Sequence, residues 1–135
     1  AGQAVHIGTD SLQTGRYTSF CTVVAVLTPG KGGRAAYCRE ITPRITSLRE
    51  RLLKEVWLSV ELAMELTTTM GIEELTVHVD ANPEERHMSS AYVKELTGMV
   101  VSQGFRVAIK PDSWCSTHCA DWAVRHLEGG RNARV

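Results

Sequence analysis

Two acidic residues follow strand-like segments of similar sequence. Asp10 closes the segment VHIGTD at residues 5–10, and Asp80 closes VHVD at residues 77–80. In an α/β sheet the ligand-binding groups lie just beyond the carboxyl ends of the strands, so each acid is a candidate site residue. Asp also suits a strand exit because its side chain hydrogen-bonds its own backbone. For either residue taken singly, that structural role is the commoner one.

A third acid, Glu55, stands apart from the other acids of the long helix that surrounds it. Successive helical residues rotate by roughly 100°, which places Glu55 about 60° from Leu52, at the edge of the apolar stripe. A carboxylate turned toward the sheet is costly unless something compensates its charge. The compensation comes either from a structural partner, an Arg or His78, or from a cation shared with Asp10 and Asp80.

Three carboxylates at one end of a sheet repel one another unless a cation lies between them. Mg²⁺ and Mn²⁺ prefer such oxygen ligands and take few of them from protein. Two such ions promote hydrolysis of a phosphodiester, because one activates water and the other stabilises the leaving oxygen. The pattern is therefore compatible with a two-metal nuclease, although a purely structural carboxylate network is the commoner explanation of such a cluster.

The order of the expected elements explains how these acids would meet. Strands are predicted at residues 4–9, 17–28, 34–42, 74–80 and 105–110. Helices are predicted from a cap at Ser47 to about Gly71, and at about residues 89–102 and 116–127. We expect an α/β fold with a mixed five-stranded sheet, antiparallel in its first three strands, and helices on both faces. The first and fourth strands are expected to be central neighbours, and the tail EGGRNARV to fray.

Length and charge bound the class of protein. The chain of 135 residues suits a single domain spanning 1–135. Its 15 basic and 15 acidic residues balance, so the net charge gives no indication of a nucleic-acid or membrane partner. Basic residues gather in the segment 31–54, which forms either a solvated face or a phosphate-contacting face. We expect no membrane partner and a cytoplasmic location, because no apolar run suits a bilayer and no signal peptide is evident.

The cysteines could suggest a zinc site instead. Cys115 and Cys119 enclose His118 in CSTHC, but no fourth ligand follows at zinc-finger spacing. Buried, reduced thiols are the favoured interpretation.

Longer motifs resemble the YkuK family of predicted ribonuclease-H-like proteins. They are VHIGTDSLQT, SLRERLLKEV, VHVDANPEERHMSSAYVKELTGMVVSQGF and IKPDSWCSTHCADWAVRH, and they span nearly the whole chain. The expected ribonuclease-H-like fold of that family agrees with the element order predicted above. The resemblance implies a nuclease that binds two Mg²⁺ or Mn²⁺ ions and acts on RNA, DNA or their hybrid.

The resemblance also implies a site of four acids. Asp10, Glu55 and Asp80 match the first three, and Asp121 in the last helix matches the fourth. Placement on an ideal helix does not support Asp121, because it falls on the polar side. Asp112 is therefore a rival metal ligand.

Contacts to nucleic acid are assigned to Ser11, Lys110, Arg51 and His118. For Lys110 and His118, a surface lysine and a loop histidine are the commoner interpretations. Near the basic segment the candidate aromatic residues are Tyr37 and Trp57, so base stacking is expected to be minor.

Two further possibilities stay open. Exposed Trp114 and Trp122 would suit a homodimer face, although Trp at the edge of a core is the commoner explanation. A non-catalytic nucleic-acid-binding or scaffold domain with the same fold competes with the nuclease, because a fold alone does not determine function.

Overall fold

The structure is a computed structural model of the chain, and it describes residues 3–81, 83–84, 88–126 and 133–134. Its strands are β1 (Ala4–Thr14), β2 (Tyr17–Thr28), β3 (Gly32–Pro43), β4 (Leu75–His78), β5 (Arg106–Ala108) and β6 (Ala133–Arg134). Its helices are α1 (Leu48–Met70), η1 (Met88–Tyr92), α2 (Val93–Val101), η2 (Cys115–Ala120) and α3 (Asp121–His126). All five predicted strands are therefore present.

The strands form one mixed sheet in the order β5-β4-β1-β2-β3-β6. β1 pairs antiparallel with β2 and parallel with β4, which confirms that the first and fourth strands are central neighbours. β6 is an addition that the sequence did not predict: two residues of the tail pair with β3 at Ala36 and Tyr37. The rest of that tail, apart from these two residues, lies outside the described residues.

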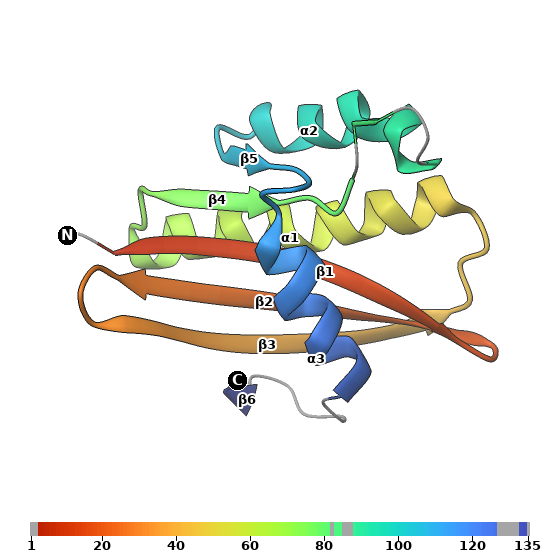
Figure 1. Cartoon of the computed structure of the whole chain (residues 1–135), viewed down its shortest axis with the longest axis horizontal. Coiled ribbons are helices and arrows are strands. Elements are labelled where there is room, and N and C mark those ends of the chain that lie inside the picture. Colours follow the sequence, from red (N-terminus) through yellow and green to blue (C-terminus); the bar gives the residue numbers. More distant parts are fainter. Residues whose placement is uncertain (1–2, 82, 85–87, 127–132, 135) are drawn as a thin grey trace.

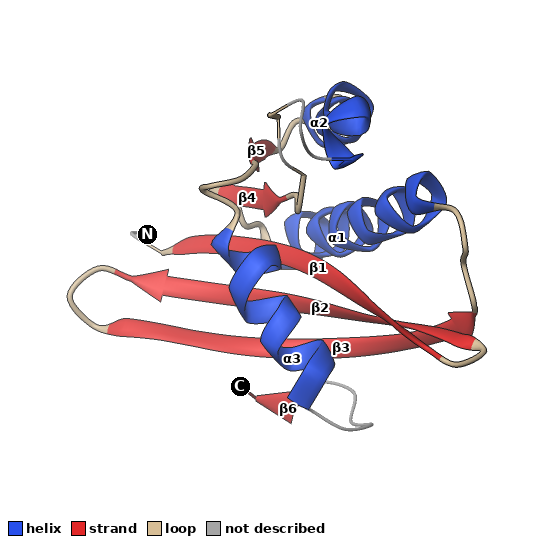
Figure 2. Ribbon diagram, turned by 45° about the vertical axis from the view of Figure 1, so that its right-hand side comes forward, coloured by secondary structure: helices blue, strands red, loops and turns tan. Residues whose placement is uncertain are grey.

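Helices cover both faces of the sheet, as expected (Figure 1). α1 and α2 pack on one face, with Leu96 and Val100 of α2 in the same core cluster as the buried residues of α1. η2 and α3 cross the other face over β1, β2 and β3 (Figure 2). Among the described residues, no helix is long and apolar enough to cross a membrane.

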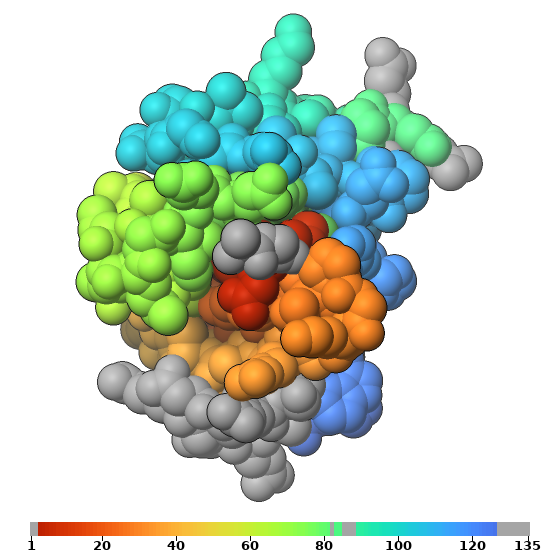
Figure 3. All heavy atoms as spheres, turned by 90° about the vertical axis from the view of Figure 1, so that its left-hand side faces the viewer, coloured from red at the N-terminus to blue at the C-terminus, as the bar shows by residue number. Residues whose placement is uncertain are grey.

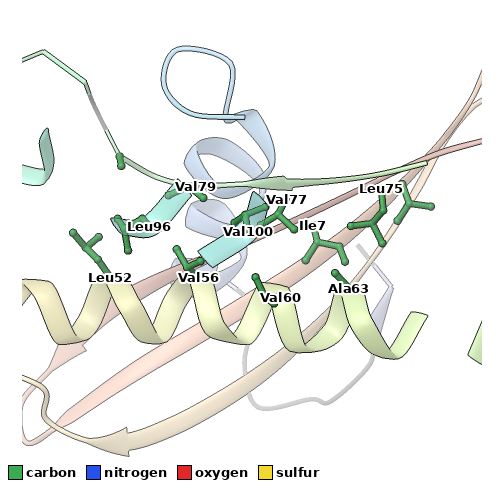
Figure 4. Packing of buried hydrophobic residues seen from close by; sticks show 12 residues of the cluster. Ile7, Leu52, Val56, Val60, Ala63, Leu75, Val77, Val79, Leu96 and Val100 are labelled. Atoms are coloured by element: carbon green, nitrogen blue, oxygen red, sulfur yellow. The ribbon is translucent and has the colours of Figure 1, made fainter. Parts of the chain in front are cut away.

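One apolar stripe of α1 builds the larger core. Its buried residues, labelled in Figure 4, are Leu52, Val56, Val60 and Ala63. They face Ile7 of β1 and the residues of β4, which are buried in the same cluster. Burying one such aliphatic side chain stabilises a fold by about 1.5–3 kcal/mol, so this stripe holds α1 against the sheet.

The ends of α1 lie where the sequence predicts them. Ser47 is the N-cap, and its hydroxyl accepts a hydrogen bond from the Glu50 amide at 3.2 Å. Gly71 ends the helix in the left-handed region, with φ of 64°, which glycine adopts without steric cost. Glu55 is thereby placed two turns into a helix whose start is fixed.

Two strand ends differ from the prediction, and both differences concern the site. β1 continues to Thr14, because residues 10–14 pair with the start of β2 in a long hairpin. Asp10 therefore lies within β1 and not beyond its end. β4 stops at His78, so Asp80 lies two residues past its strand.

The last helix also departs from an ideal α-helix. It begins with the π-helical segment η2, which packs directly on the backbone of β1. A Cβ atom added at Gly8 would lie 2.4 Å from the amide nitrogen of Ser116, so only glycine fits there. This close approach brings the start of α3 over the middle of β1.

Candidate active site

The candidate site lies where β1 outruns its neighbour β4. β1 pairs with β4 only from Val5 to Gly8, and then continues alone on that side. The open edge of β1 beyond Gly8 faces the end of β4. α1 packs against one face of β1 there, and η2 and α3 against the other, so acids from four segments can meet.

Asp10 and Asp121 meet on the face covered by α3. Asp10 is only 8% exposed, and its side chain is hydrogen-bonded to that of Asp121, the first residue of α3. Asp121 also accepts a hydrogen bond from Nε of Arg125 at 2.9 Å. Placement on an ideal α-helix had set Asp121 apart from the other acids. The π-helical turn of η2 has i→i+5 hydrogen bonds, so it changes the rotation of the residues that follow.

Glu55 approaches from the other face and is 5% exposed. Its Oε2 accepts a hydrogen bond of 2.5 Å from the hydroxyl of Ser11, which lies on the α1 side of β1. The structural partner expected from the sequence was an Arg or His78. The structure assigns the hydrogen bond to Ser11, while Arg51 acts only through its charge.

Asp80 completes the group from the loop after β4. Its Oδ1 lies 2.9 Å from Nζ of Lys110, an ion pair between partly exposed side chains. The same oxygen is shielded from solvent and accepts no well-directed hydrogen bond within the described part of the chain, so the contact with Lys110 is electrostatic. Asp80 and Glu55 line the same narrow crevice, which has no room for a water molecule.

The acids perturb one another strongly. Burial, the hydrogen bond with Asp121 and the charge of Asp80 raise the pKa of Asp10 to about 8. Burial, followed by the charge of Asp10, raises the pKa of Glu55 well above its ordinary value. For Asp121, burial acts to raise the pKa, but the hydrogen bonds with Asp10 and Arg125 outweigh it and lower the pKa. Asp10 therefore holds a proton that it shares with ionised Asp121.

The chemistry of these groups suits a hard divalent cation, although their present arrangement does not. In the described residues, no three His, Cys, Asp or Glu side chains are disposed to hold a metal ion. The carboxyl groups are held by a proton, by Ser11 and by Lys110. The donors are nevertheless all oxygen, burial keeps Asp10 and Glu55 out of solvent, and one buried oxygen of Asp80 has no hydrogen bond among the described residues. The residues thus fit Mg²⁺ or Mn²⁺ by donor type.

The remaining predicted site residues are dispersed. Asp112 is exposed in a turn, where its amide donates to the Ile109 carbonyl oxygen, and it is not among the groups that shift the pKa of Asp10 or Glu55. His118 is exposed on η2, and its charge lowers the pKa of Asp121. Nε of Arg51 is buried without a hydrogen bond among the described residues.

Sequence reasoning missed a cluster that holds η2 in place. Nδ1 of His78 accepts a hydrogen bond from the Cys115 amide at 3.2 Å. Nε2 of His78 lies 2.8 Å from Nδ1 of His6. Because Nδ1 of His78 accepts this hydrogen bond from the Cys115 amide, the ring proton of neutral His78 is on Nε2, and Nε2 donates a hydrogen bond to Nδ1 of His6. Burial, with the charge of His6, lowers the pKa of His78 to about 4, so the pair is neutral at physiological pH. Trp114 packs on both rings. The repeated VH before each acid was the available signal.

The structure bears separately on two further predictions, those for the cysteines and for the basic segment. None of the four cysteines forms a disulfide, and Cys21 and Cys115 are buried. The basic segment 31–54 does not form one surface: Lys31 lies in the β2–β3 turn and Arg34 near the start of β3, at the end of the sheet remote from Asp10. Figure 3 views that remote end, with the turn in orange. Tyr37, a predicted stacking residue, is only 4% exposed and cannot stack on a base.

Comparison with known proteins defines the class. A family model described as ribonuclease H-like matches residues 2–125. Together with the mixed sheet and its helices, this match shows that the chain belongs to the ribonuclease H-like family.

A more specific relative is the uncharacterized protein YkuK of Bacillus subtilis (strain 168). It is 32% identical over 123 residues, which span 80% of this chain and 71% of the relative. The resemblance to the YkuK family is therefore confirmed. Among solved structures, LC9-RNase H1, a type 1 RNase H with the type 2 active-site motif, covers 98% of this chain and 76% of its own. Its identity is 14% and its TM-score is 0.46.

Proposed function

We propose that residues 1–135 form a single ribonuclease-H-like domain that hydrolyses phosphodiester bonds of nucleic acid with Mg²⁺ or Mn²⁺. The observation that carries the proposal is the hydrogen-bonded pair of Asp10 and Asp121 beside the buried Glu55. Such a group of acids is costly without a cation, and membership of the ribonuclease H-like family supplies the substrate class.

Asp10, Glu55, Asp80 and Asp121 would hold the ions. When bound, two ions supply an activated water and stabilise the leaving oxygen of an in-line displacement. Asp112 is left out of this set because it is exposed and is not among the groups that shift the pKa of Asp10 or Glu55.

Neighbouring residues of the chain would orient these acids and the substrate. Ser11 fixes the carboxyl group of Glu55, and Arg125 fixes that of Asp121. Lys110 holds Asp80 in the absence of a cation and is half-exposed, so its ammonium group can turn to a substrate phosphate. His118 is exposed one turn before Asp121 and could contact the same backbone. Arg51 lies beside Glu55 with an unused Nε.

The test is cleavage of labelled RNA, single-stranded DNA and an RNA–DNA hybrid in Mn²⁺. Wild type and Asp10→Asn are compared, because the amide keeps the shape of the side chain but cannot ionise to hold a cation. Cleavage by wild type alone supports the proposal and identifies the substrate. Equal cleavage by both proteins, or none by either, contradicts it.

A second candidate is a binding domain of the same fold without catalysis. The observation that favours it is the arrangement of the described acids, which are held by protein partners and not disposed around a common ion. A nuclease gains thermal stability from Mn²⁺, because the ion binds only the folded chain, and Asp10→Asn loses that gain. A binding domain shows nucleic-acid affinity without either effect.

A further inference from the structure

Part of the sheet beside the site is left uncovered. α3 packs over Cys21 and Val23 of β2 and Tyr37 of β3, which are all buried. Toward the β1–β2 turn, none of the described helices lies over the same face (Figure 2). Two large apolar side chains lie open in this part, with Tyr17 57% exposed and Ile41 62% exposed.

Strand register places these residues on one surface. Side chains alternate along a strand, so Tyr17 shares the face of Cys21, and directly paired residues share a face. Ile41 pairs with Ser19, which pairs with Leu12. Pro43 pairs with Tyr17, which pairs with Thr14. We call this surface the open platform, and it consists of Leu12, Thr14, Tyr17, Ile41 and Pro43.

The open platform continues the strand that carries Asp10. Leu12 lies two residues and Thr14 four residues after Asp10 on the same face of β1. At about 3.4 Å per residue, the platform therefore extends from about 7 Å to about 14 Å beyond the candidate site. A strand of nucleic acid whose phosphate lies at Asp10 can reach it within a few nucleotides.

The charges around the platform suit a phosphate backbone. Arg16 precedes Tyr17 and is exposed, and Arg44 follows Pro43. Nη1 of Arg44 donates to the Gly15 carbonyl oxygen at 2.8 Å, which holds this side chain beside the turn. Arg39 lies between platform and site, with Nε donating to the Ser19 hydroxyl at 2.9 Å. No acid belongs to the platform itself.

We propose that the open platform binds unpaired bases of the substrate, with Tyr17 as the stacking residue. The proposal rests on the proposed function and specifies its substrate as a strand with a single-stranded segment next to the cut. Stacking on an exposed aromatic ring needs the flat face of a base, which a duplex hides between its own base pairs. Arginines at the border contact phosphates without reading sequence, so little base preference is expected.

The test measures stacking without cleavage. A single-stranded oligonucleotide carrying 2-aminopurine, whose fluorescence falls when it stacks, is titrated in EDTA with Asp10→Asn and with Asp10→Asn combined with Tyr17→Ala. Loss of one stacking contact is expected to weaken binding by about 5- to 150-fold and to abolish the quenching. Tyr17→Phe keeps the ring and should behave as wild type. Trp57→Ala is the matched control, because Trp57 is also exposed, 46%, but lies on α1 across the sheet.

The readout separates this proposal from the proposed function. If Asp10→Asn still cleaves nucleic acid, the proposed metal site is wrong. The quenching of 2-aminopurine fluorescence needs no cleavage, so it tests base binding by the open platform independently. Unchanged binding and quenching in Tyr17→Ala overturn the platform, as does an equal loss in Trp57→Ala. Self-association that Tyr17→Ala abolishes in sedimentation, with oligonucleotide binding intact, overturns it in favour of a contact between two copies.

Discussion

The carboxyl groups of Asp10 and Asp121 are hydrogen-bonded to each other across the gap between β1 and the start of α3. Two ionised carboxylates cannot form such a bond, so the pair holds one proton. The residues are 111 positions apart in the chain, and the π-helical segment η2 and the glycine beneath it bring them together.

The shared proton predicts an unusual pH dependence of stability. The folded pKa of Asp10, about 8, exceeds its ordinary value of 3.8, so the folded state binds more protons between these values. Stability from this group is present below about pH 4 and is lost as the pH rises toward about 8. Without metal, wild type should lose up to about 1.4 kcal/mol per pH unit relative to Asp10→Asn. Parallel urea-unfolding curves of the two proteins across this range would contradict the shared proton.

Glu55→Gln should separate stability from metal binding. Burial and the charge of Asp10 raise the pKa of Glu55, so they disfavour its ionised form, and a neutral Gln keeps the shape of the side chain and an oxygen that can accept the Ser11 hydrogen bond. The free energy of unfolding without metal should change by less than about 1 kcal/mol. The thermal stabilisation by Mn²⁺, measured by calorimetry, should disappear. Glu61→Gln, on the exposed side of α1, is the control and should keep it.

Gly8→Ala should destabilise the fold by displacing η2 from β1. The added Cβ would lie 2.4 Å from the Ser116 amide nitrogen, and backbone on both sides cannot yield easily. We expect a loss of about 1–3 kcal/mol or more on denaturant unfolding, because η2 must move off β1. Gly98→Ala, in α2 with no atom within 4 Å of its added Cβ, should instead gain about 0.5–1 kcal/mol. Equal effects at the two positions would contradict the close packing of η2.

Lys110→Ala should tighten the binding of Mn²⁺. The ammonium group lies 2.9 Å from Oδ1 of Asp80 and competes with a cation for that oxygen. Removing a competitor worth about 1 kcal/mol in a partly exposed pair should lower the Mn²⁺ dissociation constant roughly fivefold in isothermal titration. Lys94→Ala, an exposed lysine of α2, should leave it unchanged. Weaker Mn²⁺ binding in Lys110→Ala would show that Lys110 organises Asp80 for the ion.

The sequence determined the elements and their order, because their signals are local. The β-branched residues of β2, the cap at Ser47 and the glycine at 71 are signals that depend on neighbours within a few positions, and all appear in the structure. The rotation of Glu55 toward the sheet was local too, since an ordinary α-helix has a constant angle per residue. Pairing of β1 with β4 followed from the alternation of strands and helices.

Tertiary structure alone decided which groups meet at the site. Helical rotation misplaced Asp121, because the chain enters α3 through the π-helical segment η2. Long-range contacts hold η2 in place: its packing on Gly8 and the hydrogen bond from the Cys115 amide to His78. The basic residues of the segment 31–54 lie at opposite ends of the sheet, because a long strand separates residues that are close in sequence. Tyr17 became open and Tyr37 buried, because α3 covers only part of one face. Burial and long-range contact depend on the whole packed chain, and no local pattern contains them.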